Sequence, residues 1–131
     1  FLGVVGAVVI GIIVALVCFF MVSVVKHKFG YDDSLDAFGV HGIGGIIGAL
    51  LTGFLATPAI QSSYSGLFYG NPKQLWIQLV ATVATIIFSG IMTFVLYKIV
   101  DSLVGIRATQ KEEIAGLDIT QHNEMALAES D

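Results

Sequence analysis

The sequence has little charge and few residues that interrupt a hydrophobic segment. Only 12% of its 131 residues are charged, and it holds two prolines; a soluble domain carries about 25% charged residues. Asp, Glu, Lys and Arg are all absent from residues 1–25, 37–72 and 74–97. Because a helix of about 20 apolar residues crosses the hydrocarbon core of a bilayer, these gaps exclude a soluble globular domain. They predict an all-α integral membrane protein.

Cysteine and catalytic signatures are equally scarce. The single cysteine, Cys18, excludes a disulfide framework within the chain. The sequence contains no GxGxxG, P-loop, G-x-S-x-G or HExxH pattern. We therefore expect no enzyme activity, no cofactor, no metal and no nucleic-acid partner. The chain starts inside a hydrophobic segment without a methionine, so we expect it to be the C-terminal part of a longer protein.

The hydrophobic pattern predicts three transmembrane helices, at about residues 2–25, 34–55 and 72–103, within a membrane domain of residues 1–105. Residues 26–31 are expected to form a short basic turn, and residues 61–73 an aromatic-rich loop. Residues 106–131 are predicted to form a soluble acidic tail.

Two stripes of side chains mark faces of these helices. A small-residue stripe in the first helix predicts close packing against another helix of the subunit or a neighbouring subunit; its members are Gly3, Ala7, Gly11 and Ala15. A polar stripe in the third helix predicts hydrogen bonds between helices, with a direct transport role as the alternative; its members are Gln78, Thr82, Thr85, Ser89 and Thr93.

The basic residues predict how the chain is oriented. Five of the six lie near the first turn or near the end of the third helix and the tail, and the sixth is Lys73. Because cytoplasmic loops are enriched in Lys and Arg, we expect the first turn and the tail to be cytoplasmic. The predicted location is the plasma membrane, with several passes.

Residues 32–53 hold the one ionisable group inside an uncharged apolar segment, His41. Such groups face a cavity or a partner, because lipid solvates them poorly, so His41 is predicted to line a narrow pore. The alternative is a structural histidine bonded to a backbone carbonyl. Asp33 is expected to cap the second helix and Asp36 to occupy its third position. The alternative for these acids and Asp32 is a vestibule at the cytoplasmic mouth that gathers cations.

The motif DDSLDAFGVHGIGG, residues 32–45, resembles the signature of ammonium transporters of the Amt/Mep/Rh superfamily, and the likeness extends along the chain. It implies the ninth to eleventh helices of an eleven-helix subunit, in a homotrimer with one pore per subunit that carries ammonium or ammonia. His41 then matches the second of two pore histidines and Ala37 a pore-lining position. Asp36 matches the cytoplasmic exit. For bacterial members the expected location is the inner membrane.

The resemblance continues into the tail. The Gly116-Leu117-Asp118 turn is similar to the regulatory tail of the family, which in bacterial members meets PII-type signal proteins. Asn123 stands where the family usually has glycine, and Leu127 where a tyrosine is common. The leading hypothesis is ammonium transport; an ammonium sensor on the same scaffold and a plain structural helix bundle are the alternatives.

Overall fold

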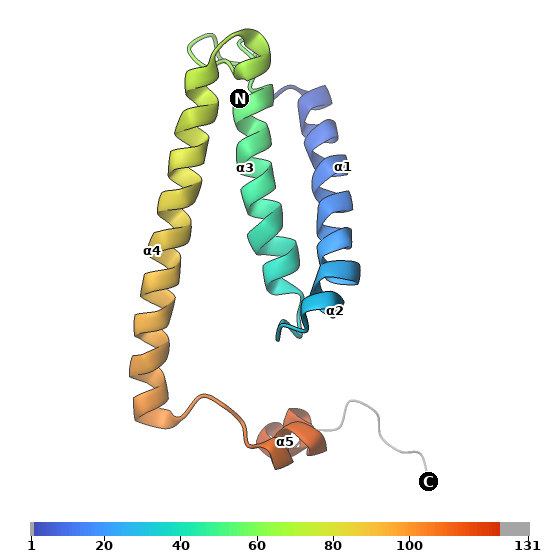
Figure 1. The fold of residues 1–131 in the computed structure, drawn as a ribbon, viewed down its shortest axis with the longest axis vertical. Coiled ribbons are helices and arrows are strands. Elements are labelled where there is room, and N and C mark those ends of the chain that lie inside the picture. Colours follow the sequence, from blue (N-terminus) through green and yellow to red (C-terminus); the bar gives the residue numbers. More distant parts are fainter. Residues whose placement is uncertain (1, 124–131) are drawn as a thin grey trace. The chain divides into compact units, whose positions relative to one another are not determined.

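A computed structural model describes residues 2–123, and every regular element in that range is a helix (Figure 1). Three of its helical segments are long and apolar enough to cross a membrane: Val4–Phe29, Phe38–Leu55 and Pro72–Val104, with 26, 18 and 33 residues. The predicted all-α fold with three membrane-spanning segments is confirmed. Residues 124–131, which include Leu127, lie outside the described part of the chain.

The first segment is longer than predicted. It comprises α1 (Val4–Phe20), a π-helical turn η1 (Met21–Val25) and α2 (Lys26–Phe29). The predicted turn at residues 26–31 is therefore wrong for its first four residues. The helix ends instead at Gly30, which takes a left-handed conformation with φ of 61°. Glycine is the residue best suited to that position after a helix, and no residue before it stops the helix.

The second segment starts later than predicted. A π-helical turn, η2 (Phe38–Gly42), leads into α3 (Ile43–Leu55), whereas the sequence predicted a start at Ser34. The backbone of Asp36 is left-handed, with φ of 56°, and its N–H donates to the Asp33 carbonyl at 3.0 Å. This turn prevents helix before residue 37. Asp36 accordingly precedes the helix and is not its third residue.

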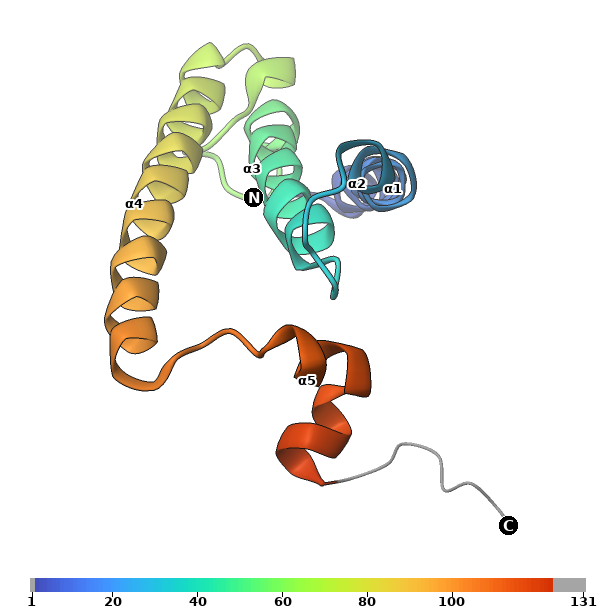
Figure 2. The same cartoon turned by 60° about the horizontal axis from the view of Figure 1, so that its bottom comes forward.

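Helices α1 and α3 lie side by side and run in opposite directions (Figures 1 and 2). Glycines on α3 allow the close approach: a Cβ at Gly44 would lie 3.1 Å from Cys18 Sγ and 3.4 Å from Val14 Cγ1. The small-residue stripe of α1 points elsewhere. Gly11 is exposed, and a Cβ there would meet no described atom within 4 Å. The packing partner predicted for that stripe is therefore not α3 and stays a prediction.

The loop after α3 returns the chain to the start of α4 (Pro72–Val104) through a short 3₁₀ turn, η3 (Leu67–Tyr69). Pro72 opens α4 because its missing N–H would have no partner in the first turn. A Cβ at Gly53 would lie 3.0 Å from the Cα of Leu75, so glycine lets the end of α3 touch α4. The predicted third helix, residues 72–103, agrees with α4.

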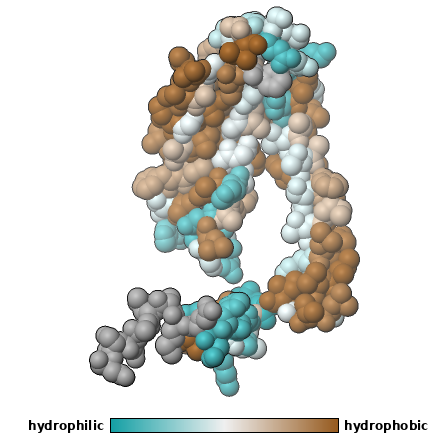
Figure 3. All heavy atoms as spheres, turned by 180° about the vertical axis from the view of Figure 1, so that it is seen from behind, coloured by the Kyte–Doolittle hydropathy of each residue, from teal (hydrophilic) through white to brown (hydrophobic). Residues whose placement is uncertain are grey.

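The chain divides into two compact units, Phe1–Phe88 and Ser89–Asp131. The second contains the later part of α4, the short helix α5 (Gln110–Ala115) and a π-helical turn η4 (Asp118–His122). Apolar side chains cover much of the surface of the long helices (Figure 3). That surface suits contact with lipid or with other membrane helices.

Candidate functional site

His41 lies in the π-helical turn η2, whose five residues are Phe-Gly-Val-His-Gly. A π turn takes one more residue than an α turn and occurs often at functional sites. Its imidazole is exposed and makes no hydrogen bond to residues 2–123. The alternative of a histidine bonded to a nearby carbonyl therefore finds no support in this part of the chain.

The turn separates two environments on neighbouring residues. Gly39 is buried, and a Cβ there would lie 3.0 Å from Val22 Cγ2 of η1. His41, two residues later, is exposed. One turn further, at Gly45, a Cβ would meet no described atom within 4 Å. The side of the segment that carries His41 is thus apolar, thin and open within the described residues.

Asp33 holds the start of η2. Its carboxylate accepts from the N–H of Phe38 at 3.1 Å and from the N–H of Gly39 at 3.2 Å. These are N–H groups that a helix start leaves without partners, and a carboxylate there also suits the positive end of the helix dipole. Asp32, in contrast, is exposed and accepts only a long 3.4 Å bond from Ser34 Oγ within the described chain.

Lys26 joins the two acids that flank the turn before η2. Its Nζ donates to the Asp33 carbonyl oxygen at 2.7 Å and to Asp36 Oδ1 at 2.6 Å. The Lys26 and Asp36 side chains are only 22% and 34% exposed. From the sequence, we used Lys26 only to predict that the first turn lies on the cytoplasmic side. Its pairing depends on the left-handed backbone of Asp36 and on helix continuing past Val25, neither of which was predicted.

Two further side chains line the inner side of η2. Cys18 is buried, and its thiol donates to the Val40 carbonyl at 3.5 Å. The Tyr31 ring meets the Phe38 ring edge to face at 6.0 Å. The Tyr31 hydroxyl is buried and has no hydrogen-bond partner within residues 2–123. Val40 is thereby held from α1, and Phe38 from the loop that follows α2.

The other two predicted pore residues precede η2. Ala37 is exposed directly before it, and Asp36 is paired with Lys26. Among residues 2–123, no three His, Cys, Asp or Glu side chains come close enough to hold a metal ion. The structure therefore brings Asp33 and Asp36 together around Lys26. Within residues 2–123, no titratable side chain forms a hydrogen bond or ion pair with His41.

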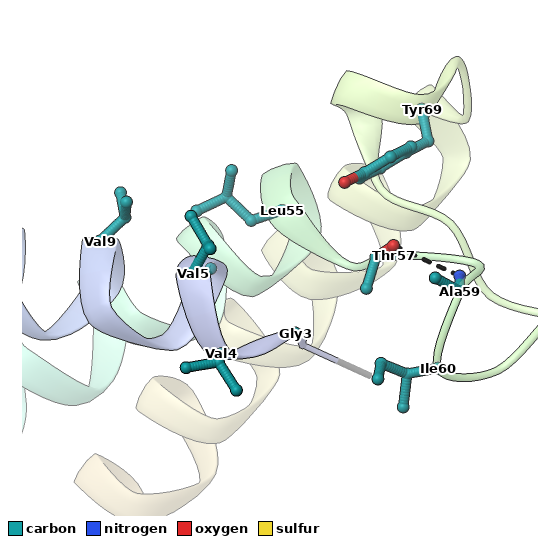
Figure 4. Close-up of a pocket in the computed structure, with 10 residues that line it drawn as sticks. Gly3, Val4, Val5, Val9, Leu55, Thr57, Ala59, Ile60 and Tyr69 are labelled. Carbon is teal, nitrogen blue, oxygen red and sulfur yellow. Dashed lines mark hydrogen bonds between the residues drawn. The ribbon is translucent and has the colours of Figure 1, made fainter.

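A cavity of about 340 Å³ lies at the other end of α1 and α3 (Figure 4). Its wall combines Val5 and Val9 of α1, Leu55 of α3 and Tyr69 of η3. Thr57 also faces it, and its hydroxyl accepts from the N–H of Ala59 at 3.3 Å. The lining is mainly apolar, and its polar side chains are those of Thr57 and Tyr69.

The tail motif forms a compact turn of its own. Gly116 has φ of 95°, and a Cβ there would clash with Asp118 Oδ1, which explains the glycine. Thr120 donates through its backbone N–H and its hydroxyl to the Gly116 carbonyl, at 3.1 and 2.9 Å. Leu117 precedes η4, and Asn123 follows it with φ of 53°. Asparagine enters this left-handed region more readily than most residues, which suits it to the position after η4.

Helix α5 begins with a capping box. The Thr109 N–H and hydroxyl both donate to Glu112 Oε2 at 2.7 Å, and the Glu112 N–H donates to Thr109 Oγ1 at 3.4 Å. The hydrogen bonds from the Thr109 hydroxyl and then from its N–H lower the pKa of Glu112. The reciprocal bonds explain why a six-residue exposed helix begins at Gln110.

Three long apolar helices define the chain as a multi-pass membrane segment. The model of the Ammonium Transporter Family matches residues 1–127, and the chain belongs to that family. It is 50% identical over 126 residues to an ammonium transporter of Bacillus subtilis (strain 168), with 95% of this chain and 31% of the relative covered.

The chain is also similar to ammonium transporters of other organisms. The chain is 46% identical to an ammonium transporter of Aquifex aeolicus (strain VF5), covering 96% of this chain and 29% of the relative. It is 42% identical to Ammonium transporter Amt1 of Archaeoglobus fulgidus, covering 96% and 32%. The chain thus spans about a third of the length of the curated relatives that it matches.

Proposed function

We propose that the full-length protein carries ammonium or ammonia across a membrane, and that His41 lines the pore. The observation that carries this proposal is an exposed imidazole, without a hydrogen bond to the described residues, in an apolar segment of a family member. Family membership and the similarity to ammonium transporters of Bacillus subtilis and Aquifex aeolicus support the substrate.

The chemistry of the site fits a neutral guest. A neutral imidazole has one hydrogen-bond donor and one acceptor. One ring nitrogen can therefore bond ammonia while the other bonds a fixed partner. Since no such partner lies within residues 2–123, we propose that the remaining part of the protein supplies it, in line with the paired histidines implied by the resemblance. Ala37 and Asp36 lie on the cytoplasmic side of His41 in this arrangement.

The experiment is uptake of labelled methylammonium by the full-length protein in cells lacking other ammonium transporters. His41→Ala should reduce uptake at least tenfold, the loss that corresponds to about 1.4 kcal/mol in the barrier. His27→Ala is the matched control because His27 is exposed on α2 among polar residues. Equal uptake by wild type and His41→Ala would refute the pore role, provided that both reach the membrane in equal amounts.

We further propose that the protein is a homotrimer in the plasma membrane, the inner membrane in a bacterium, with a cytoplasmic tail that meets a PII-type protein. The distribution of basic residues supports this orientation. The compact turn at Gly116, Leu117 and Asp118 supports a structured docking element. Gel filtration with light scattering tests the trimer, and binding of a purified PII protein before and after deletion of residues 106–131 tests the tail.

An ammonium sensor on the same scaffold is the second candidate, favoured by the short helix α5 and the π-helical turn η4 in the tail. It predicts that deletion of residues 106–131 removes a nitrogen-dependent response and leaves uptake unchanged. If the deletion changes uptake alone, the tail gates or assembles the transporter.

A further inference from the structure

Lys26 is the one cation that contacts both sides of the turn leading into η2 among the described residues. The Lys26 Nζ bridges the Asp33 carbonyl and the Asp36 carboxylate, at 2.7 and 2.6 Å. The Asp33 carbonyl also accepts the Asp36 N–H at 3.0 Å, and the Asp36 carbonyl accepts the Val40 N–H at 2.9 Å. One side chain therefore closes a four-residue turn whose last carbonyl is already bonded into η2.

The π-helical turn η1 brings Lys26 to this place. Each residue of an α-helix advances about 100° around the axis, so the extra residue taken up by a π turn rotates all later residues by about that angle. Without η1, Lys26 would project from another side of the helix. The two π turns also touch, since the site of a Gly39 Cβ is 3.0 Å from Val22 Cγ2 and 3.9 Å from Met21 Cβ.

The left-handed backbone of Asp36 has a cost that the contact with Lys26 offsets. A non-glycine residue in that region is disfavoured, although Asp and Asn tolerate it best. A hydrogen bond between two oppositely charged groups is shorter and stronger than one between neutral groups. The bond from Lys26 to Asp36 therefore helps to hold the turn, and with it the first residue of η2.

We propose that Lys26 is a positioning residue: through Asp33 and Asp36 it fixes the π turn that presents His41. Loss of the contact loosens the start of η2 and moves His41, although Lys26 is separated from His41 by the whole turn. This inference deepens the proposed pore role of His41 and rests on it for its functional consequence. Its structural part stands independently.

Cys18 provides a readout that does not depend on transport. Its thiol is buried against the Val40 carbonyl and the Gly44 backbone, so alkylation requires η2 to move away. N-ethylmaleimide labelling of the full-length protein in membranes, followed by mass spectrometry of the Cys18 peptide, measures that opening. Local opening of this kind sets the labelling rate when opening is fast and rare.

Lys26→Met keeps most of the side-chain volume and removes the charge. It should raise the Cys18 labelling rate about tenfold, because the turn that holds the start of η2 loses the charge-assisted hydrogen bond from Lys26 to Asp36. Lys26→Arg should restore a rate near that of wild type. Lys28→Met is the matched control, because Lys28 is exposed on the same short helix and, within residues 2–123, its Nζ lies near the Phe29 ring, 6.0 Å from the centroid, and makes no ion pair.

Asp36→Asn tests the other side of the contact without disturbing the backbone, since asparagine tolerates the left-handed region. It should raise labelling as Lys26→Met does, whereas Asp32→Asn should not. Labelling in Lys26→Met or Asp36→Asn that equals wild type, or an equal rise in the two controls, would overturn the inference.

Uptake of labelled methylammonium by the same variants separates the two proposals. If Lys26→Met raises labelling and lowers the maximal uptake rate, both stand. If labelling rises and uptake is unchanged, the positioning by Lys26 stands and the pore role of His41 fails. If uptake falls while labelling is unchanged, the positioning inference fails and the transport proposal stands.

Discussion

The contact between Gly44 and Cys18 gives the sharpest test of how α1 and α3 pack. A Cβ on Gly44 would lie 3.1 Å from Cys18 Sγ and 3.4 Å from Val14 Cγ1. The distance to Cys18 Sγ is shorter than an ordinary van der Waals contact, whereas the distance to Val14 Cγ1 lies at the lower limit of one. Gly44→Ala therefore forces the sulfur or the helices apart, and Cys18→Ala removes the atom that stands in the way.

Two effects of opposite sign act in the single variant. Crowding in a packed interface costs about 1–3 kcal/mol, while alanine favours a helix over glycine by about 1 kcal/mol. The second effect is the same whether or not Cys18 is present, so it cancels in a double-mutant cycle. We expect Gly44→Ala to be less destabilising, by about 1 kcal/mol, in the Cys18→Ala background than in wild type, as is typical for residues in contact.

The assay is the thermal unfolding midpoint of the full-length protein in one detergent, followed by intrinsic fluorescence for wild type, both single variants and the double variant. The Cys18→Ala single variant accounts for loss of the hydrogen bond to the Val40 carbonyl. An effect of Gly44→Ala that is the same in both backgrounds would mean that Cys18 and Gly44 do not touch, and the described helix pair would be wrong.

Three further outcomes follow from the contacts. Asp33→Ala removes a helix cap that contributes about 1 kcal/mol to the free energy of unfolding, so it should lower the unfolding midpoint. Asp32→Ala should leave the midpoint unchanged. Tyr31→Phe should keep or raise the midpoint because it removes a buried hydroxyl without a partner in the described chain; a clear fall would reveal a partner elsewhere in the protein. The pKa of Glu112 lies below its ordinary value of 4.5 because of bonds from Thr109. Its capping box is therefore intact above that value and lost as pH falls through the lowered pKa, which hydrogen exchange of the α5 amides should detect as faster exchange; exchange that does not change with pH, after correction for the intrinsic rate, would argue against the box.

Much of the fold could be predicted because hydrophobic length depends only on composition. The third helix, predicted at residues 72–103, matches Pro72–Val104 because Pro72 marks its start and Gly105 follows its end with φ of 68°. The ends of the first and second segments were missed. The first continues to Phe29 because Gly30, and no earlier residue, provides the left-handed position.

The candidate site was only partly accessible from the sequence. His41 could be singled out because it is the one ionisable group in an apolar run. The π turns could not, because a single extra residue in one turn leaves no periodic signal in the sequence. The role of Lys26 was also missed. Its partners Asp33 and Asp36 lie seven and ten residues away, and their contact with it depends on the left-handed backbone of Asp36, which the sequence does not reveal.

The most direct test of the central claim is an experimental structure of the full-length protein in a lipid bilayer. We expect a channel without lipid along the exposed side of η2, with one ring nitrogen of His41 facing it and the other bonded to a side chain from outside residues 2–123. A His41 ring packed against another helix and bonded to a backbone carbonyl, with no channel beside it, would refute the proposed pore role.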